Sequence, residues 1–156
     1  MYPLVDGPSA WIFGVHLPEW EVPPRYDFLR EEHARVDPLY RGTIRAALAG
    51  DGATARRLAG ELTELLETHM AWEETQLWPQ AAAGLDPAGR VLRELGYEHQ
   101  GVRAGLAKLG PTLEEILAGR AANKVVEKLE LDLLHMFEHH QEREEEALFP
   151  WLERVL

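Results

Sequence analysis

Residues 62–77 read Leu-Thr-Glu-Leu-Leu-Glu-Thr-His-Met-Ala-Trp-Glu-Glu-Thr-Gln-Leu. Apolar side chains recur in this stretch at steps of three and four residues, the period of an α-helix that buries one face. His69 and Glu73 fall at positions of that period where apolar residues are expected. Because residues four apart lie above one another on a helix, both side chains point towards the core. The stretch therefore predicts a helix with two ionisable side chains on its buried face.

The same period continues from about Tyr26 towards the end of the chain and divides into four segments. The predicted helices span about residues 27–49, 53–80, 87–109 and 120–152, and residues 112–118 form a further short turn. Asp51-Gly52 is expected to separate the first two helices, and Gly110-Pro111 to stop the third. Gly101 and Gly105 are expected to let another helix approach the third closely. Since short connections favour antiparallel neighbours, the predicted fold is all-α, an up-down antiparallel four-helix bundle.

The chain has 156 residues, a length that predicts one domain with a core of useful size. Residues 1–25 differ in composition from the rest, because they hold five prolines and two tryptophans. Proline resists regular helix, while tryptophan offers a large apolar anchor. We therefore expect an irregular N-terminal arm over residues 1–25 and the helical bundle over residues 26–156.

Composition also excludes several classes of function. The formal net charge of -11 repels a phosphate backbone, and no basic stripe is present, so nucleic acid is not an expected partner. The chain has no cysteine, so any metal must be held by histidines and carboxylates. No apolar run approaches the roughly 20 residues that span a bilayer, and the N-terminus does not resemble a signal peptide. A cytoplasmic protein without a membrane partner is expected, and the sequence points to no particular protein partner.

Each predicted helix carries one histidine within its apolar stripe. These histidines are His33, His69, His99 and His140. Glu73 and Glu144 follow two of them by four residues and so face the core as well. An unpaired carboxylate in a dry core costs several kcal/mol, and no inward lysine or arginine is placed to neutralise both. A pair of metal ions, bridged by the carboxylates and completed by the imidazoles, would compensate the buried charge.

The chain contains an internal repeat. Residues 69–79 align without gaps to residues 140–150, and the two segments share His, Glu, Glu, Leu and Pro at matching positions. The first and third helices share the pair Glu-His, at Glu32-His33 and Glu98-His99. The chain is thus interpreted as two helical hairpins, each of which supplies one His and then one His-x-x-x-Glu. Two half-sites of three ligands, related by an approximate twofold axis, would result.

This order of motifs resembles the hemerythrin-like HHE cation-binding domain, over about residues 26–152. The resemblance implies a bundle that holds two iron ions with a bridging oxo or hydroxo group and binds dioxygen, nitric oxide or peroxide; manganese and zinc are alternatives. It carries over the ligands His33, His69, Glu73, His99, His140 and Glu144. The oxygen-carrying hemerythrins have a second histidine one turn after the third-helix histidine, where this chain has Arg103. Because fewer protein ligands leave metal positions open, reaction or sensing is favoured over reversible oxygen transport.

Three functions remain open at this stage. The first is a di-iron centre that binds or turns over small oxygen or nitrogen species, with peroxide decomposition or oxidase activity as possible enzymatic outcomes. The second is a module that senses or stores iron or oxygen without turnover. The third is an oxidase or hydrolase that uses the same ligands with manganese or zinc. No nucleophile motif or nucleotide-binding loop supports the third.

Several other side chains are candidates for a place near the metal. Helical rotation turns His135 and His139 away from the face of His140, so surface positions are expected for them. The approach of the remaining candidates to the metal stays open: His16, Asp37, Tyr40, Glu74 and Glu145.

Overall fold

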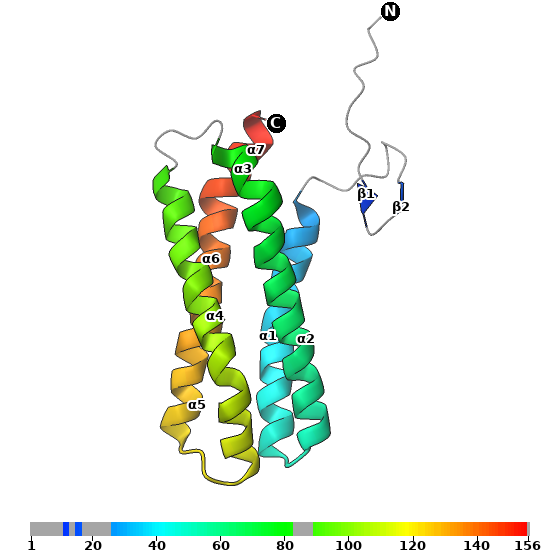
Figure 1. The fold of residues 1–156 in the computed structure, drawn as a ribbon, viewed down its shortest axis with the longest axis vertical. Helices are drawn as coiled ribbons and strands as arrows, with labels where there is room; N and C mark the ends of the chain where they lie inside the picture. The colour runs from blue at the N-terminus through cyan, green and yellow to red at the C-terminus, as the bar shows by residue number, and fades with distance from the viewer. Residues whose placement is uncertain (1–10, 13–14, 17–25, 83–88, 156) are drawn as a thin grey trace, which may run out of the picture.

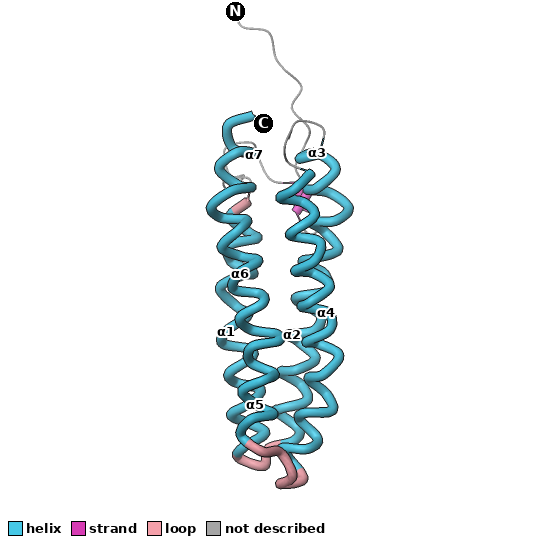
Figure 2. Tube along the Cα trace, turned by 90° about the vertical axis from the view of Figure 1, so that its left-hand side faces the viewer, coloured by secondary structure: helices cyan, strands magenta, loops and turns pink. Residues whose placement is uncertain are grey.

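A computed structural model describes residues 11–12, 15–16, 26–82 and 89–155 of the chain. Four long helices pack side by side along one axis (Figures 1 and 2). Helical segments that follow one another along the axis are called a column here, and the columns are numbered in chain order. The first column is α1 (Asp27–Leu48), the second begins with α2 (Gly52–Trp72), and the third is α4 (Gly89–Leu117). Neighbouring columns run in opposite directions, so the predicted antiparallel four-helix bundle is confirmed. None of the helices among these residues is long and apolar enough to cross a membrane.

Two columns consist of consecutive helical segments. The second column continues from α2 through the π-helical turn η2 (Glu73–Leu77) into α3 (Trp78–Ala82). The fourth column contains, in order, α5 (Asn123–Leu129), η3 (Glu130–His135), α6 (Met136–Arg143), η4 (Glu144–Leu148) and α7 (Phe149–Val155). The helical period of the sequence did not reveal the three π-helical turns.

Within the predicted N-terminal arm, the structure describes two short strands. β1 (Trp11–Ile12) and β2 (Val15–His16) pair in antiparallel fashion, with Trp11 opposite His16 and Ile12 opposite Val15. This pairing was not predicted from the proline-rich composition. The rest of the predicted arm lies outside the described residues.

The connection between α1 and α2 is built by the residues that the sequence singled out. Gly50 has a φ of 78°, a left-handed conformation that glycine adopts without a steric penalty. The Asp51 side chain accepts a hydrogen bond of 3.1 Å from the backbone N–H of Thr54 and so caps the start of α2. The break predicted at Asp51-Gly52 is therefore confirmed.

The predicted stop of the third helix at Gly110-Pro111 is wrong. α4 continues through both residues to Leu117 and includes the stretch predicted as a separate short turn. Pro111 lies on an exposed face, whereas Leu113 and Ile116, which follow it, are buried in the core. Their burial stabilises the helix beyond the backbone hydrogen bond that proline removes. The helix ends instead before Gly119, whose φ is 72°.

Two apolar clusters fill the core, one on each side of a polar layer. Every helical column contributes to both clusters and crosses the polar layer between them. The flanking residues, column by column, are Leu29 and Val36, Leu66 and Leu77, Leu95 and Val102, and Phe137 and Leu148. Each of the four histidines in the apolar stripe lies between the two members of such a pair in the sequence. The polar side chains therefore form one layer of the bundle with apolar packing above and below.

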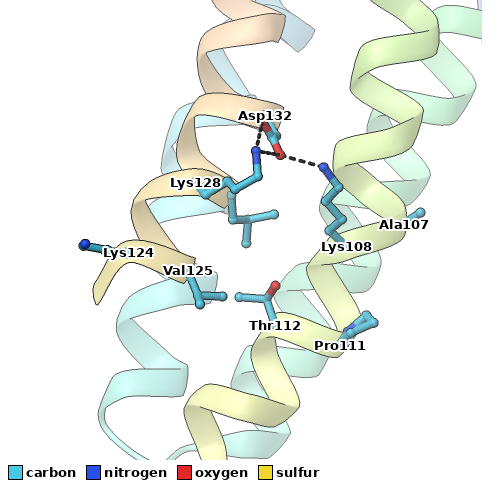
Figure 3. Close-up of a pocket in the computed structure, with 9 residues that line it drawn as sticks. Ala107, Lys108, Pro111, Thr112, Lys124, Val125, Lys128 and Asp132 are labelled. Carbon is cyan, nitrogen blue, oxygen red and sulfur yellow. Dashed lines mark hydrogen bonds and ion pairs between the residues drawn. The ribbon is translucent and has the colours of Figure 1, made fainter. Parts of the chain in front are cut away.

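A surface pocket of about 460 Å³ lies between α4 and α5 (Figure 3). All three lysines of the chain line it, namely Lys108, Lys124 and Lys128. Lys108 and Lys128 both bind the carboxylate of Asp132, at 2.6 and 3.2 Å. None of the six predicted metal ligands lines this pocket, so it is separate from the polar layer.

The close helix approach predicted at Gly105 leads to a stability test. A methyl group on Gly105 would lie 2.8 Å from the backbone oxygen of Asp132 and 2.9 Å from the Cβ atom of Leu133, both on the facing column. Gly105→Ala should therefore destabilise the fold by about 1–3 kcal/mol, the usual cost of overpacking. Gly60→Ala, inside α2, is the matched control, because nothing lies within 4 Å of its new methyl group. Alanine should stabilise that helical position by about 0.5–1 kcal/mol. Urea unfolding measures both, and equal effects would contradict the close approach.

Candidate metal centre

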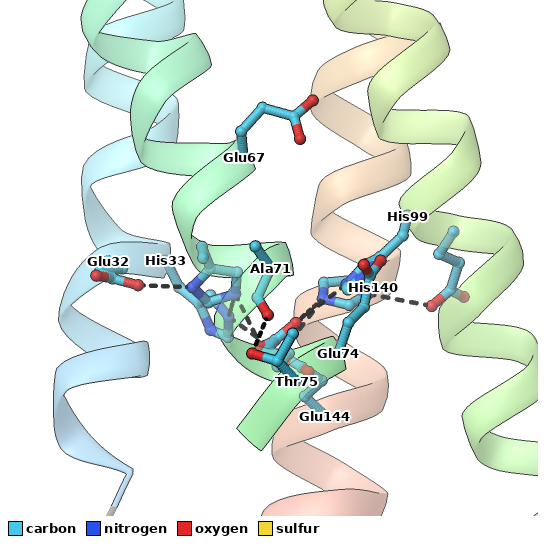
Figure 4. Close-up of polar contacts among 12 residues, drawn as sticks. Glu32, His33, Glu67, Ala71, Glu74, Thr75, His99, His140 and Glu144 are labelled. Atoms are coloured by element: carbon cyan, nitrogen blue, oxygen red, sulfur yellow. Dashed lines mark hydrogen bonds and ion pairs between the residues drawn. The ribbon is translucent and has the colours of Figure 1, made fainter. Parts of the chain in front are cut away.

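The six predicted ligands meet in the polar layer of the bundle. Figure 4 labels four of them, His33, His99, His140 and Glu144. None of them exposes more than 3% of its surface. Their donor atoms form two groups, within each of which the atoms lie no more than 4.8 Å apart: His33, His69, Glu73 and Glu144, and Glu73, His99 and His140. We call the pair His33 and His69 the first half-site and the pair His99 and His140 the second half-site.

The two buried glutamates lie between the half-sites. Glu73 Oε1 is 2.9 Å from Nε2 of His69, and Glu73 Oε2 is 3.0 Å from Nε2 of His99. Its two oxygens thus face different half-sites. Glu144 Oε2 lies 3.2 Å from Nε2 of His33 and 3.4 Å from Nε2 of His140, so it also faces both half-sites. Both carboxylates therefore lie between the two half-sites, within 3.4 Å of an imidazole of each.

Both of these glutamates occupy the same local structure. Glu73 is the first residue of η2, and Glu144 is the first residue of η4. Each π-helical turn is followed, after one intervening residue, by a proline, Pro79 or Pro150. Proline lacks the N–H group that an α-helix requires, which favours a wider turn before it. The shared Leu-x-Pro of the repeat therefore accompanies a backbone distortion of a kind that is frequent at functional sites.

A second set of glutamates surrounds the imidazoles. The Nδ1 atom of each histidine faces one of these carboxylates: His33 faces Glu145 at 3.3 Å, His69 faces Glu32 at 2.7 Å, His99 faces Glu74 at 2.8 Å, and His140 faces Glu98 at 3.6 Å. Because an ionised carboxylate only accepts hydrogen bonds, the bonded Nδ1 atoms carry the proton. The Nε2 atoms then face the centre of the layer, where loss of a proton would let them bind a metal, which is the orientation that metal-binding histidines adopt.

The inner atoms have unsatisfied hydrogen-bonding capacity. Both carboxylate oxygens of Glu144 and both ring nitrogens of His140 are buried without a hydrogen-bond partner among the described residues, although ring nitrogens and carboxylate oxygens approach within ion-pair distance. Buried polar atoms left in this way are costly. Two ligands at right angles on an ion with bonds of about 2.1 Å lie about 3 Å apart, close to the separations observed here. The donor set and its spacing therefore fit metal ions.

Comparison with known families matches the Hemerythrin HHE cation binding domain over residues 25–155. The chain belongs to this hemerythrin HHE family. No curated protein and no solved structure matches it. The buried histidine and glutamate groups are suited to the cation binding for which the family is named.

In this hemerythrin HHE domain, Arg103 lies one turn beyond His99. Its guanidinium donates to Glu74 at 2.8 Å and to Glu67 at 3.2 Å, at the edge of the polar layer. The guanidinium carries no lone pair for a metal. The position therefore supplies a cation to the surrounding carboxylates instead of an imidazole to the centre.

Proton affinities in the layer are strongly perturbed. Burial lowers the pKa of His69, but its bonds to Glu32 and Glu73 outweigh burial and raise that pKa to about 9. Burial likewise opposes charge on His140, yet the charge of Glu144 and contacts with Glu73 place the pKa of His140 well above its ordinary value. For Glu73, burial raises the pKa, while the surrounding imidazoles shift that pKa well below its usual range. In the absence of metal, protons on His69 and His140 compensate the buried carboxylates.

Two further sequence candidates lie elsewhere. Asp37 forms a surface ion pair with Arg41 at 2.7 Å. Tyr40 is buried and borders a different pocket, together with Arg41 and Glu130. Its phenol oxygen has no hydrogen-bond partner within the described part of the chain. Neither side chain belongs to the two groups of donor atoms.

The other histidines are not part of the described centre. His135 pairs with Glu138, and His139 pairs with Glu142, through side chains that are 46% and 73% exposed. Both lie on the surface, as helical rotation predicts. The side chain of His16 lies outside what the structure describes.

Sequence reasoning missed the role of the outer carboxylates. Glu74 and Glu145, weighed as possible additional ligands, instead contact imidazole Nδ1 atoms. Glu32 and Glu98 were noted only as part of a repeated Glu-His pair. The repeated Glu-His pair was the available signal, because a glutamate that precedes two inward histidines of one chain indicates the same role at both positions. Which imidazole each carboxylate contacts depends on helix packing.

The metal-free domain should lose stability as the pH rises. The pKa of His69 is about 9 in the folded chain, against about 6.5 when unfolded. Its contribution is therefore fully present below about pH 6.5 and is lost as the pH rises through 9, by a few kcal/mol. Metal binding should follow the opposite trend, because protons compete with metal for Nε2. Urea unfolding of chelator-treated protein between pH 6.5 and 9.5 measures the first effect. A stability that stays constant or increases over this range would contradict it.

Proposed function

We propose that this chain is a non-haem di-iron protein that binds or reacts with dioxygen, peroxide or nitric oxide. The observation that carries the proposal is the orientation of Glu73, whose two oxygens lie 2.9 and 3.0 Å from imidazoles of different half-sites. A carboxylate that faces two imidazole pairs supports two adjacent metal positions rather than one. The family match supports a cation as the ligand.

The donor set supports iron among the possible metals. Each half-site offers two imidazoles and shares two carboxylates, which is close to the two-histidine, one-carboxylate set that holds non-haem iron with open positions. A pair of iron ions bound there would supply redox chemistry and binding positions for small ligands. Manganese and zinc tolerate similar donors, so the metal must be measured.

The protein's own contribution is to hold the donors and exclude water. Phe137 lies 5.5–6.0 Å, between ring centroids, from the imidazoles of His33, His69 and His140. Trp78 stacks on His99 at 4.6 Å. These rings fill the space beside the ligands, and the outer carboxylates fix the imidazole orientations.

The burial of the centre favours small molecules as the species that it binds. The three surface pockets described for this structure are lined by none of the six ligand residues. An extended organic substrate has no preformed route to the polar layer in those pockets. Diatomic molecules and peroxide need only small openings between side chains. The proposal therefore favours such ligands over the substrates of a hydrolase.

Metal content is the decisive measurement. Protein purified without added metal should contain about two irons per chain and absorb in the near ultraviolet. His69→Ala and His140→Ala should each reduce the iron content and remove the absorption bands, because each removes an inward Nε2 atom. His135→Ala and His139→Ala are matched controls on the surface of the fourth column, which also carries His140, and should keep both signals. A folded, colourless, metal-free wild-type protein would overturn the di-iron proposal.

A peroxide assay separates turnover from binding. Decomposition well above the rate of free iron, lost in His69→Ala and kept in His139→Ala, would support an enzyme. Stoichiometric binding of nitric oxide or dioxygen without turnover would support a sensor or carrier. The proposal expects one of these two outcomes for the iron-loaded wild-type protein. Iron-loaded protein that does neither would contradict it.

A further inference from the structure

The two half-sites differ in the groups that surround their outer carboxylates. In the second half-site, Glu74 Oε1 is shared between His99 Nδ1 and Arg103, both at 2.8 Å. Glu98 accepts from Arg143 at 2.9 Å, while its other oxygen remains 3.6 Å from His140. Each carboxylate of the second half-site is therefore engaged by an arginine.

The first half-site lacks these arginines among the described residues. Glu32 binds His69 Nδ1 at 2.7 Å, and Glu145 faces His33 Nδ1 at 3.3 Å. No described arginine or lysine forms an ion pair with either carboxylate. Each therefore directs its charge to one imidazole alone, and Glu32 does so through a short hydrogen bond.

The internal repeat identifies what replaces each arginine. Aligning His33 with His99 places Asp37 opposite Arg103, so an anion stands where the second half-site has a cation. Aligning His69 with His140 places Trp72 opposite Arg143.

The partner of Arg143 has changed as well. Arg143 pairs with Glu94, whose equivalent in the first hairpin is Phe28. Phe28 packs edge-on against Trp72, with ring centroids 4.8 Å apart. An ion pair in one half thus corresponds to an aromatic contact in the other. The symmetry of the inner ligands is broken in the layer around them.

This difference acts on the metal through the imidazoles. A carboxylate that accepts from Nδ1–H raises the basicity of the ring and strengthens its bond to a metal. A guanidinium on the same carboxylate competes for its charge and places a positive charge near the ion. Glu67 and Glu94 partly compensate the arginines, but each side chain is more exposed than the imidazole-contacting carboxylate that shares its arginine, Glu74 for Glu67 and Glu98 for Glu94.

We propose that the two metal positions are unequal, with the first half-site binding metal more tightly and Arg103 and Arg143 weakening the second. This inference rests on the proposed two-metal function. The arginines act as tuning residues, because they contact the outer carboxylates and not the metal donors. Changes to groups around metal ligands commonly alter affinity by roughly 10–100-fold, so the two binding steps should differ by at least about tenfold.

Calorimetric titration of the metal-free protein with Co²⁺, a probe for nitrogen and oxygen donors, tests the inequality. Wild-type protein should bind two ions in two resolved steps. The variant Arg103→Gln/Arg143→Gln should tighten the weaker step by roughly tenfold and leave the tighter step unchanged. The control Arg56→Gln/Arg120→Gln removes the same charge from exposed pairs with Glu114 and Glu115 and should change neither step. If both double variants changed the Co²⁺ affinities equally, the effect would come from net charge alone, and the proposal would be overturned.

A second measurement assigns the steps to their half-sites. His33→Ala should lose the tighter step, and His99→Ala should lose the weaker one. Wild-type protein with one equivalent of Co²⁺ gives an assignment that does not require either variant to fold, because the paramagnetic ion should shift the imidazole proton resonances of His33 and His69 first. Preferential shifts at His99 and His140 would reverse the assignment and contradict the proposal.

The failure of the inference can be told from the failure of the proposed function. Saturation at two ions through equal steps would refute the inequality and leave the two-metal centre standing. Saturation below two ions in wild-type protein would remove the basis of both.

Discussion

The burial of two carboxylates among four imidazoles is the constraint on which this bundle depends. Glu73 and Glu144 are fully buried, and burial without a compensating charge would cost several kcal/mol for each. Protons on His69 and His140 supply that charge in the metal-free chain, and metal ions would supply more of it. The apolar clusters on both sides restrict water, so the compensation has to come from within the layer. The stability of the bundle therefore depends on the imidazoles and carboxylates of the layer compensating one another's charge.

The residues around this layer position its inward side chains. The π-helical turns at Glu73 and Glu144 set the positions of the two inner carboxylates, and the outer glutamates contact the Nδ1 atoms of the rings. Phe137 and Trp78 pack against the imidazoles. Beyond them, the two hairpins no longer match: arginines occupy one half, and an aspartate and aromatic rings occupy the other. An internal repeat can thus keep the same inward residues while its neighbourhood diverges, which would give the two proposed metal positions different properties without altering the donor set.

The sequence alone determined the fold class and the set of inward ionisable residues. Both follow from the helical period, because a residue's place in that period decides whether it faces the core, whatever its chemistry. The repeat also placed Glu32 and Glu98 in matching positions beside the inward histidines His33 and His99. The period was less informative about helix ends: Gly110-Pro111 did not stop α4, since the burial of Leu113 and Ile116 outweighed a local break.

Only the tertiary structure decided how these residues meet. The contacts of Glu74 with His99 and of Glu145 with His33 join the two hairpins, so they depend on how the columns pack and not on spacing along one helix. The same holds for Arg103, which sequence comparison marks as the absence of a histidine and which packing places on Glu74. The helical period fixes the direction of a side chain within its own helix. The partner of that side chain is set by the rotation and height of a neighbouring helix, which depend on the packing of the whole core.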